Sequence, residues 1–184
     1  MGLDATVRCR CFEGGKLKPG PVPVEDLYID EDGCLSSRTL DEAYRKYDTR
    51  RFYARYDGLE RAFDAWLSDC CEHEGGEYCS EWVSNWAGCA QFCSLVKEAG
   101  GETRFPLLSK LLPDDNGGIY PAEKARATLA ELDAFIEIVS NTSQWPFPNR
   151  EPESILSEGR YWTAERIREL LVASIATGNP IRWC

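Results

Sequence analysis

What the sequence lacks excludes several classes of protein. Its 184 residues contain no run of about 18 apolar residues, so we expect no membrane-spanning helix. The first residues lack the basic and apolar regions of a secretory signal. Basic residues are few, 21 against 31 acidic ones, which gives a formal net charge of −10. This balance argues against a globally basic nucleic-acid-binding protein. We therefore expect an acidic cytoplasmic protein, with no membrane attachment and no nucleic acid as its main partner.

Recognisable catalytic motifs are also missing. The sequence has no Walker loop, no G-x-G-x-x-G and no H-E-x-x-H motif. Its only histidine is His73, and catalysis by a cysteine or serine nucleophile normally needs a neighbouring base. No surrounding pattern supports such a site, so the sequence favours a protein that is not an enzyme.

Hydrophobic periodicity predicts a mixed fold. Alternation from Leu3 to Cys11 is typical of a half-buried strand, and further strands are expected over 24–29 and 78–84. Helices are expected to begin at capping patterns at Thr39 and Asp57, and to cover 85–99, 121–140 and 163–177. We predict an α+β fold in which a small, mostly antiparallel sheet packs against four or five helices. Residues 1–142 would form the main domain. A proline-rich loop and a C-terminal helix, residues 143–184, would pack on it.

The nine cysteines are the most unusual feature of the composition. Their number is odd and no secretory signal is seen, so reduced thiols are expected. The spacing of Cys9 and Cys11 on one strand, and of Cys70 and His73 near a helix end, predicts a tetrahedral Cys₃His zinc site. Cys71 or Cys79 can replace any member of this quartet. The alternative is that these small side chains only fill the core. Zinc is the one cofactor that the sequence suggests.

Residues 44–56 concentrate positive charge and aromatic rings in an acidic chain. Five basic side chains stand against Asp48 alone, and four tyrosines and Phe52 alternate with them. Such a segment can bind phosphates and stack on bases, can supply anchors for a protein interface, or can simply pack its rings inward. The candidate contact residues are Arg50, Arg51 and Tyr53.

Acidic loops and two tryptophans suggest a protein partner. Asp30, Glu31 and Asp32 form one acidic loop, whose charge would suit a basic partner. Trp82, Asn85 and Trp86 are candidate anchors for the same kind of contact.

Several short motifs together resemble a group of uncharacterised bacterial cytoplasmic proteins. The resemblance covers about residues 1–140, and its motifs are the following: Met1–Val7 with Cys9-Arg10-Cys11, Asp30–Gly33, Cys70–His73, Ser84–Gly88 and Asn116–Gly118. The chain also looks loosely like the immunity proteins of bacterial toxin systems. That resemblance implies a non-enzymatic protein that occludes a partner, for example a basic toxin domain. The alternatives are a zinc-containing domain, structural or hydrolytic, and an RNA- or nucleotide-binding module that uses residues 44–56.

Overall fold

The computed structural model describes residues 2–114, 117–140 and 160–184, with the backbone alone for Arg160 and Tyr161. The chain forms two compact units. The sheet unit comprises Met1–Val7 and Cys79–Cys184, and the inserted unit comprises Arg8–Tyr78. The inserted unit therefore interrupts the sheet unit in the sequence.

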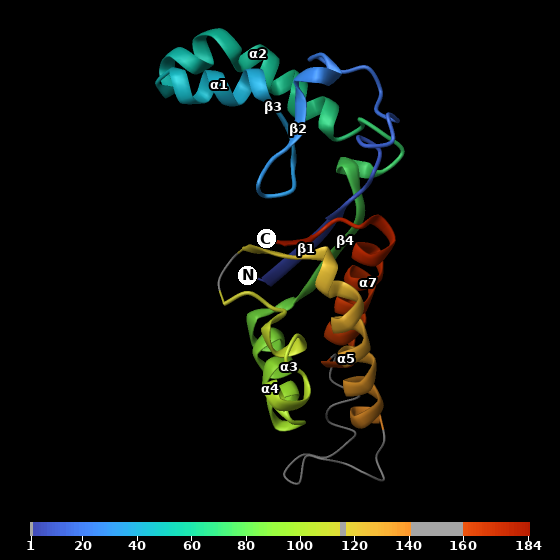
Figure 1. Ribbon diagram of the computed structural model, residues 1–184. Helices are drawn as coiled ribbons and strands as arrows, with labels where there is room; N and C mark the ends of the chain where they lie inside the picture. The colour runs from blue at the N-terminus through green and yellow to red at the C-terminus, as the bar shows by residue number, and fades with distance from the viewer. Residues whose placement is uncertain (1, 115–116, 141–159) are drawn as a thin grey trace. The chain divides into compact units, whose positions relative to one another are not determined.

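The sheet unit is built on four strands. They are β1 (Gly2–Arg8), β4 (Glu77–Asn85), β5 (Gly118–Tyr120) and β6 (Ile181–Trp183), in the order β4-β1-β6-β5. β6 pairs antiparallel with both β1 and β5, with Ala5 opposite Trp183 and Tyr120 opposite Ile181. The inserted unit thus leaves the sheet at the end of β1 and returns at the start of its neighbour β4 (Figure 1).

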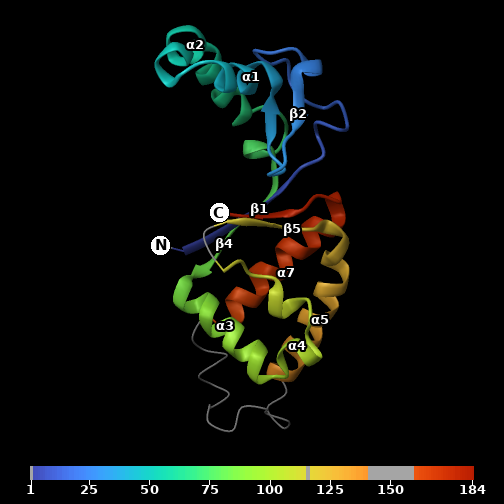
Figure 2. The same ribbon diagram turned by 60° about the vertical axis from the view of Figure 1, so that its left-hand side comes forward.

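Helices cover one face of this sheet (Figures 1 and 2). They are α3 (Trp86–Glu98), α4 (Gly101–Arg104), α5 (Ala122–Ser140) and α7 (Arg160–Thr177), with a short 3₁₀ turn over Leu108–Lys110. The alternation in β1 turns Leu3, Ala5 and Val7 towards the helices, and all three are completely buried. They pack with Phe92 and Phe135 into the main hydrophobic core.

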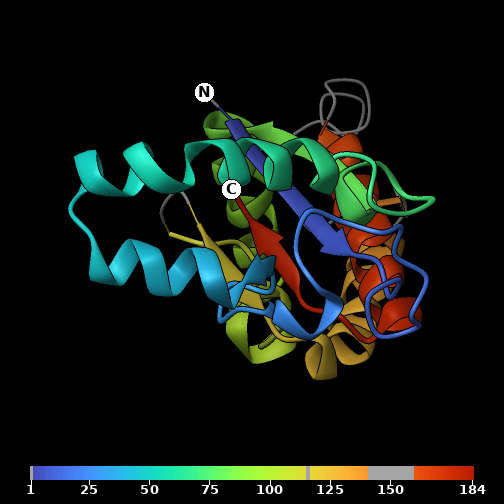
Figure 3. The same cartoon turned by 90° about the horizontal axis from the view of Figure 1, so that it is seen from above.

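The inserted unit combines a β-hairpin with a helical hairpin. A 3₁₀ turn (Val24–Asp26) leads into β2 (Leu27–Ile29), which pairs antiparallel with β3 (Leu35–Ser37). Then α1 (Arg38–Lys46) and α2 (Thr49–Leu67) lie side by side (Figure 3), and a 3₁₀ turn (Glu74–Gly76) precedes β4. This unit has a second core, formed by Val22, Leu27, Leu40, Ala43, Phe52 and Phe63.

The predicted α+β class is confirmed, but several predicted boundaries are wrong. The strand expected over 24–29 begins only at Leu27, because Val24–Asp26 form a 3₁₀ turn. β1 ends at Arg8, so Cys9 and Cys11 follow the strand. Ser37, not Thr39, caps α1 through its hydroxyl, which accepts from the Leu40 N–H. Asp48, not Asp57, caps α2 by accepting from the Arg51 N–H at 3.0 Å. A side chain that satisfies an otherwise unpaired N–H fixes where a helix begins.

The predicted division into residues 1–142 and 143–184 stays a prediction. The predicted boundary between 142 and 143 lies outside the described residues. Along the chain, the boundaries between the two units lie between residues 7 and 8 and between residues 78 and 79. The C-terminal helix α7 packs along α5 within the sheet unit.

Candidate metal centre

Two short segments at opposite ends of the inserted unit meet at one site. Cys9 and Cys11 follow β1 directly, and Cys71 and His73 lie between α2 and the turn that leads into β4. Backbone hydrogen bonds hold the segments together: Cys9 N–H donates to the Gly76 carbonyl and Lys18 N–H donates to the Cys70 carbonyl, both at 2.8 Å. These backbone hydrogen bonds therefore bring the four side chains to one place.

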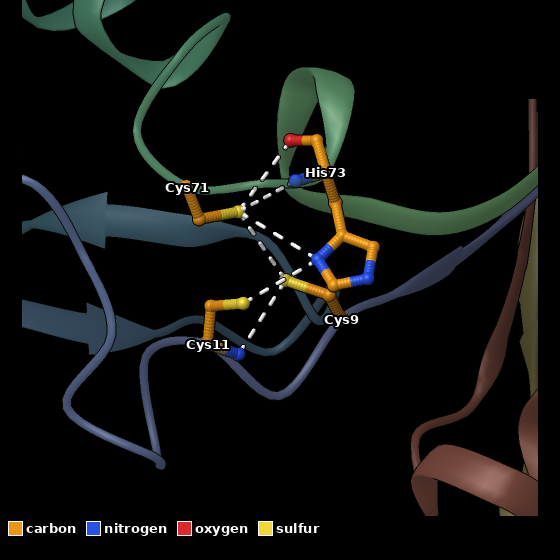
Figure 4. Close-up of side chains that lie close together, drawn as sticks. All are labelled: Cys9, Cys11, Cys71 and His73. Carbon is orange, nitrogen blue, oxygen red and sulfur yellow. Dashed lines mark hydrogen bonds between the residues drawn. The ribbon is translucent and has the colours of Figure 1, made fainter.

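The four side chains point towards a common centre (Figure 4). Their ligand atoms, three Sγ and Nδ1 of His73, all lie within 4.8 Å of one another. Cys9 Sγ is 3.7 Å from Cys71 Sγ, and His73 Nδ1 is 3.4 Å from Cys11 Sγ and 4.0 Å from Cys71 Sγ. Zinc–ligand bond lengths in a tetrahedron require about 3.8 Å between two sulfurs and about 3.6 Å between sulfur and nitrogen. These three separations are close to those values, so the group could hold one metal ion.

Two of the sulfurs accept a hydrogen bond from a backbone N–H group. Cys11 N–H donates to Cys9 Sγ, and His73 N–H donates to Cys71 Sγ, each at 3.4 Å. In both cases the donor belongs to the ligand two residues further along the chain. Such donors stabilise negative charge on a metal-bound thiolate and fix its orientation.

Burial decides what these thiols can do chemically. Cys9, Cys11 and Cys71 are all buried, while His73 is partly exposed. Desolvation raises the pKa of Cys9, and it raises the pKa of Cys11 to about 12 with a further contribution from the neighbouring Cys9. A thiol with a raised pKa is a poor nucleophile. The raised pKa argues against covalent catalysis by these thiols, whereas a metal ion would bind them as thiolates and displace their protons.

The structure brings three of the four predicted ligands together and has Cys71 in place of Cys70. The prediction assumed a helix end, where residues three apart meet. Because α2 already ends at Leu67, residues 70–73 form a turn, and residues two apart converge instead. Cys70 is buried beside the group, and burial raises its pKa to about 11 with a further contribution from Cys71. Cys79, the other alternative, belongs to the sheet unit and packs on its core. The sequence signal for the observed group is that both ligand pairs, Cys9–Cys11 and Cys71–His73, are two residues apart.

The acidic loop of the inserted unit has one structural carboxylate. Asp30 accepts hydrogen bonds from the N–H groups of Asp32 and Cys34 and from the Ser36 hydroxyl, so it organises the turn between β2 and β3. Glu31 and Asp32 are exposed. Their role as contacts for a partner stays a prediction.

The predicted anchors of the sheet unit differ in their surroundings. Trp82 is exposed and lies against Trp162, with ring centroids 5.0 Å apart. Asn85 caps α3 by accepting from the Gly88 N–H at 2.8 Å, and Trp86 packs on the main core. The Ser84–Gly88 motif therefore has a structural explanation as a helix start, and its role in partner binding stays a prediction.

Comparison of the chain with protein-family models, with curated proteins and with solved structures found no match. Among the described residues, no helix combines the length and the apolar composition needed to cross a membrane. The resemblances noted in the sequence therefore stay predictions, and the metal centre is the feature on which a function can be argued.

Proposed function

We propose that this is a zinc-binding protein in which Cys9, Cys11, Cys71 and His73 hold one structural zinc ion. The observation that supports this most strongly is the grouping of their four ligand atoms within 4.8 Å. The three separations given above, 3.7, 3.4 and 4.0 Å, are close to the edges of a zinc tetrahedron.

The donor set favours zinc over other common ions. Thiolate and imidazole ligands suit zinc, whereas calcium and magnesium prefer oxygen ligands. Three sulfurs and one nitrogen also complete a four-coordinate shell without water. A catalytic zinc keeps one position open for water or substrate, so a closed Cys₃His shell favours a structural role over a hydrolytic one.

A zinc ion at this site would cross-link the two ends of the inserted unit. Each of the pairs Cys9–Cys71 and Cys11–His73 spans 62 residues. In the chain-entropy model, a cross-link over such a loop stabilises the folded state by about 4 kcal/mol. Leu17 and Trp66 pack against both the cysteine cluster and the second core. Metal binding and the folding of this unit are therefore coupled.

The test is the mass of the full-length protein under native and denaturing conditions. We expect one zinc ion per chain, which is lost on denaturation. Cys71→Ser removes a ligand and should weaken zinc binding more than about 100-fold, judged against the 10–100-fold loss typical of changes around a metal site. The matched control is Cys70→Ser, which changes the adjacent buried thiol and should keep the zinc.

Cobalt substitution gives a second readout, which reports the type and geometry of the ligands. Cobalt(II) in a tetrahedral thiolate site produces intense visible and charge-transfer absorption, which we expect for the wild type and for Cys70→Ser. Zinc retained in Cys71→Ser but lost in Cys70→Ser would contradict the ligand assignment. Equal masses under both conditions after growth with zinc would contradict the proposal as a whole.

A further inference from the structure

The end of the α1–α2 hairpin carries a positive charge that contrasts with the rest of the chain. We define the hairpin tip as residues 44–56, which include the end of α1, the connection and the start of α2. It has five basic residues and one acidic residue, a net charge of +4 in a chain whose net charge is −10. The fold gathers cations from two helices at one place.

The one carboxylate at the tip is already engaged. Asp48 caps α2 and also pairs with Arg51 at 3.5 Å. Arg45 and Arg50 are exposed and form no ion pair with any residue that the structure describes. Their guanidinium groups are therefore available to an anionic ligand, for which their planar donors suit phosphate.

Aromatic contacts hold the rings of the tip in place. The Tyr44 ring stacks on the buried Phe52 with centroids 3.8 Å apart, and the Tyr53 ring meets Phe52 edge-on at 5.5 Å. The Tyr44 hydroxyl donates to Glu60. The Tyr44 and Tyr53 residues nevertheless remain 47% and 46% exposed. Ordered, half-exposed rings are suited to stacking because little conformational entropy is lost when a ligand binds.

We propose that the hairpin tip binds single-stranded nucleic acid. Arg45, Arg50 and Arg51 would contact phosphates, and a base would stack on Tyr53, which lies one helical turn after Arg50. An anionic membrane fits the tip less well than a nucleic acid does. Membrane insertion needs an exposed apolar helix face, and Phe52 is completely buried. An acidic protein surface would match the charge but has no bases to stack on the exposed ring faces.

This inference does not rest on the zinc site. No tip residue is a proposed zinc ligand. The acidic remainder of the chain removes long-range attraction to a polyanion, so the interaction is local and of modest affinity, in the range of micromolar dissociation constants. The overall charge therefore argues against a high-affinity nucleic-acid protein, but not against a local contact.

The test is fluorescence anisotropy of a labelled, unstructured RNA oligonucleotide of about twelve nucleotides, titrated with the full-length protein. With three or four phosphates neutralised, the affinity should fall about 20- to 50-fold between 50 and 200 mM salt. Arg45→Glu with Arg50→Glu should weaken binding at low salt by more than about tenfold and make the salt dependence shallower.

Two controls separate the site from general charge and from folding. Lys124→Glu with Arg126→Glu, exposed positions on α5, changes the net charge equally without touching the tip and should leave the affinity nearly unchanged. Tyr53→Ala should cost about tenfold, and Tyr53→Trp should keep the affinity, since both variants leave Phe52 in place. Circular dichroism of each variant checks that the helices are intact.

Three outcomes would overturn the assignment. The first is no change in anisotropy at low salt. The second is an equal loss of affinity in the α5 control. The third is binding of polyglutamate, or of phosphatidylcholine–phosphatidylserine vesicles, as tightly as RNA with no dependence on Tyr53. That result would assign the tip to an acidic protein or to a membrane instead.

Discussion

At the scale of single residues, Asp26 shows how one carboxylate organises the inserted unit. It lies in the 3₁₀ turn before β2 and accepts hydrogen bonds from the Ser37 hydroxyl and from the N–H and hydroxyl of Thr39. It therefore shares with Ser37 the capping of α1. Desolvation raises the pKa of Asp26, but the hydrogen bonds from Ser37 and Thr39 outweigh it, and the pKa is lowered overall.

The lowered pKa of Asp26 leads to a prediction about pH. Its contribution to stability is present above the pKa of the unfolded chain and is lost as the pH falls through the lower folded-state pKa. Asp26→Asn should reduce the free energy of unfolding at pH 7 by about 1–2 kcal/mol, because bonds to a charged acceptor are replaced by weaker ones. The difference from the wild type should shrink in acid. Urea unfolding, followed by circular dichroism at several pH values, measures this.

The control for Asp26 is Asp32→Asn, which neutralises an exposed acidic side chain of the same unit. It should leave the unfolding free energy nearly unchanged at every pH. An Asp26→Asn variant as stable as the wild type at pH 7 would show that the capping bonds contribute nothing.

The ligand set could be predicted only in part from the residues. The types of ligand follow from composition, because four thiols and the only histidine occur in two short segments. The choice between Cys70 and Cys71 depends on whether residues 70–73 are helical, and that depends on where α2 ends. No sequence pattern marks that end clearly, since Ser68 and Asp69 are followed directly by the cysteines.

At the scale of elements, α2 shows why helix starts are hard to predict. The pattern at Asp57 and Glu60 resembles a capping motif, yet both residues lie inside the helix. The better signal is the spacing of Phe52, Tyr56, Leu59 and Phe63, which continues the apolar face one and a half turns further towards the N-terminus. By contrast, the alternation in β1 was sufficient to predict the strand, because its inward face is uniformly apolar.

Gly58 offers a test of this longer helix. It lies in the middle of α2, and a methyl group placed there would meet no atom within 4 Å. Gly58→Ala should therefore stabilise the protein by about 0.5–1 kcal/mol through the higher helix propensity of alanine. Thermal or urea unfolding detects a change of this size. If residues 49–58 instead formed a loop, the substitution would give no such gain.

The matched glycine is Gly75, which has a φ of 60° in the turn before β4. There an alanine must adopt the left-handed conformation, so Gly75→Ala should cost about 1–2 kcal/mol. The two substitutions add the same methyl group to exposed glycines of one unit. Opposite signs of their effects would confirm that the backbone conformation, and not the added apolar surface, decides the outcome.

At the scale of the whole molecule, the insertion of one unit into another was not visible in the sequence. Unit boundaries usually show as flexible linkers rich in proline, glycine or polar residues. Here the boundaries fall near the end of β1 and the start of β4, next to the buried Cys9 and the partly buried Cys79. The pairing of these two strands joins residues about 70 positions apart, and nothing local encodes such a contact.

The hydrogen bond between Cys9 and Gly76 brings the two chain ends of the insertion close together. We therefore expect that the sheet unit can fold without the inserted unit. Replacing residues 10–75 with Asn-Gly should join β1 and β4 in a two-residue hairpin. The shortened protein should unfold cooperatively, keep the helical signal of α3, α5 and α7, and bind no zinc. Circular dichroism and metal analysis check both points. A shortened chain without cooperative unfolding would show that the sheet unit depends on the inserted unit.

The central place of β6 has a consequence for synthesis. β6 pairs with β1 on one side and β5 on the other, yet it follows β1 by about 170 residues. At 5–20 residues per second, a ribosome reaches β6 roughly ten to thirty seconds after β1. During that interval one edge of β1 lacks its neighbour β6, and by its end the whole inserted unit has been synthesised. We therefore expect the nascent chain to form its second core and to bring its metal ligands together first, and to complete its main sheet last.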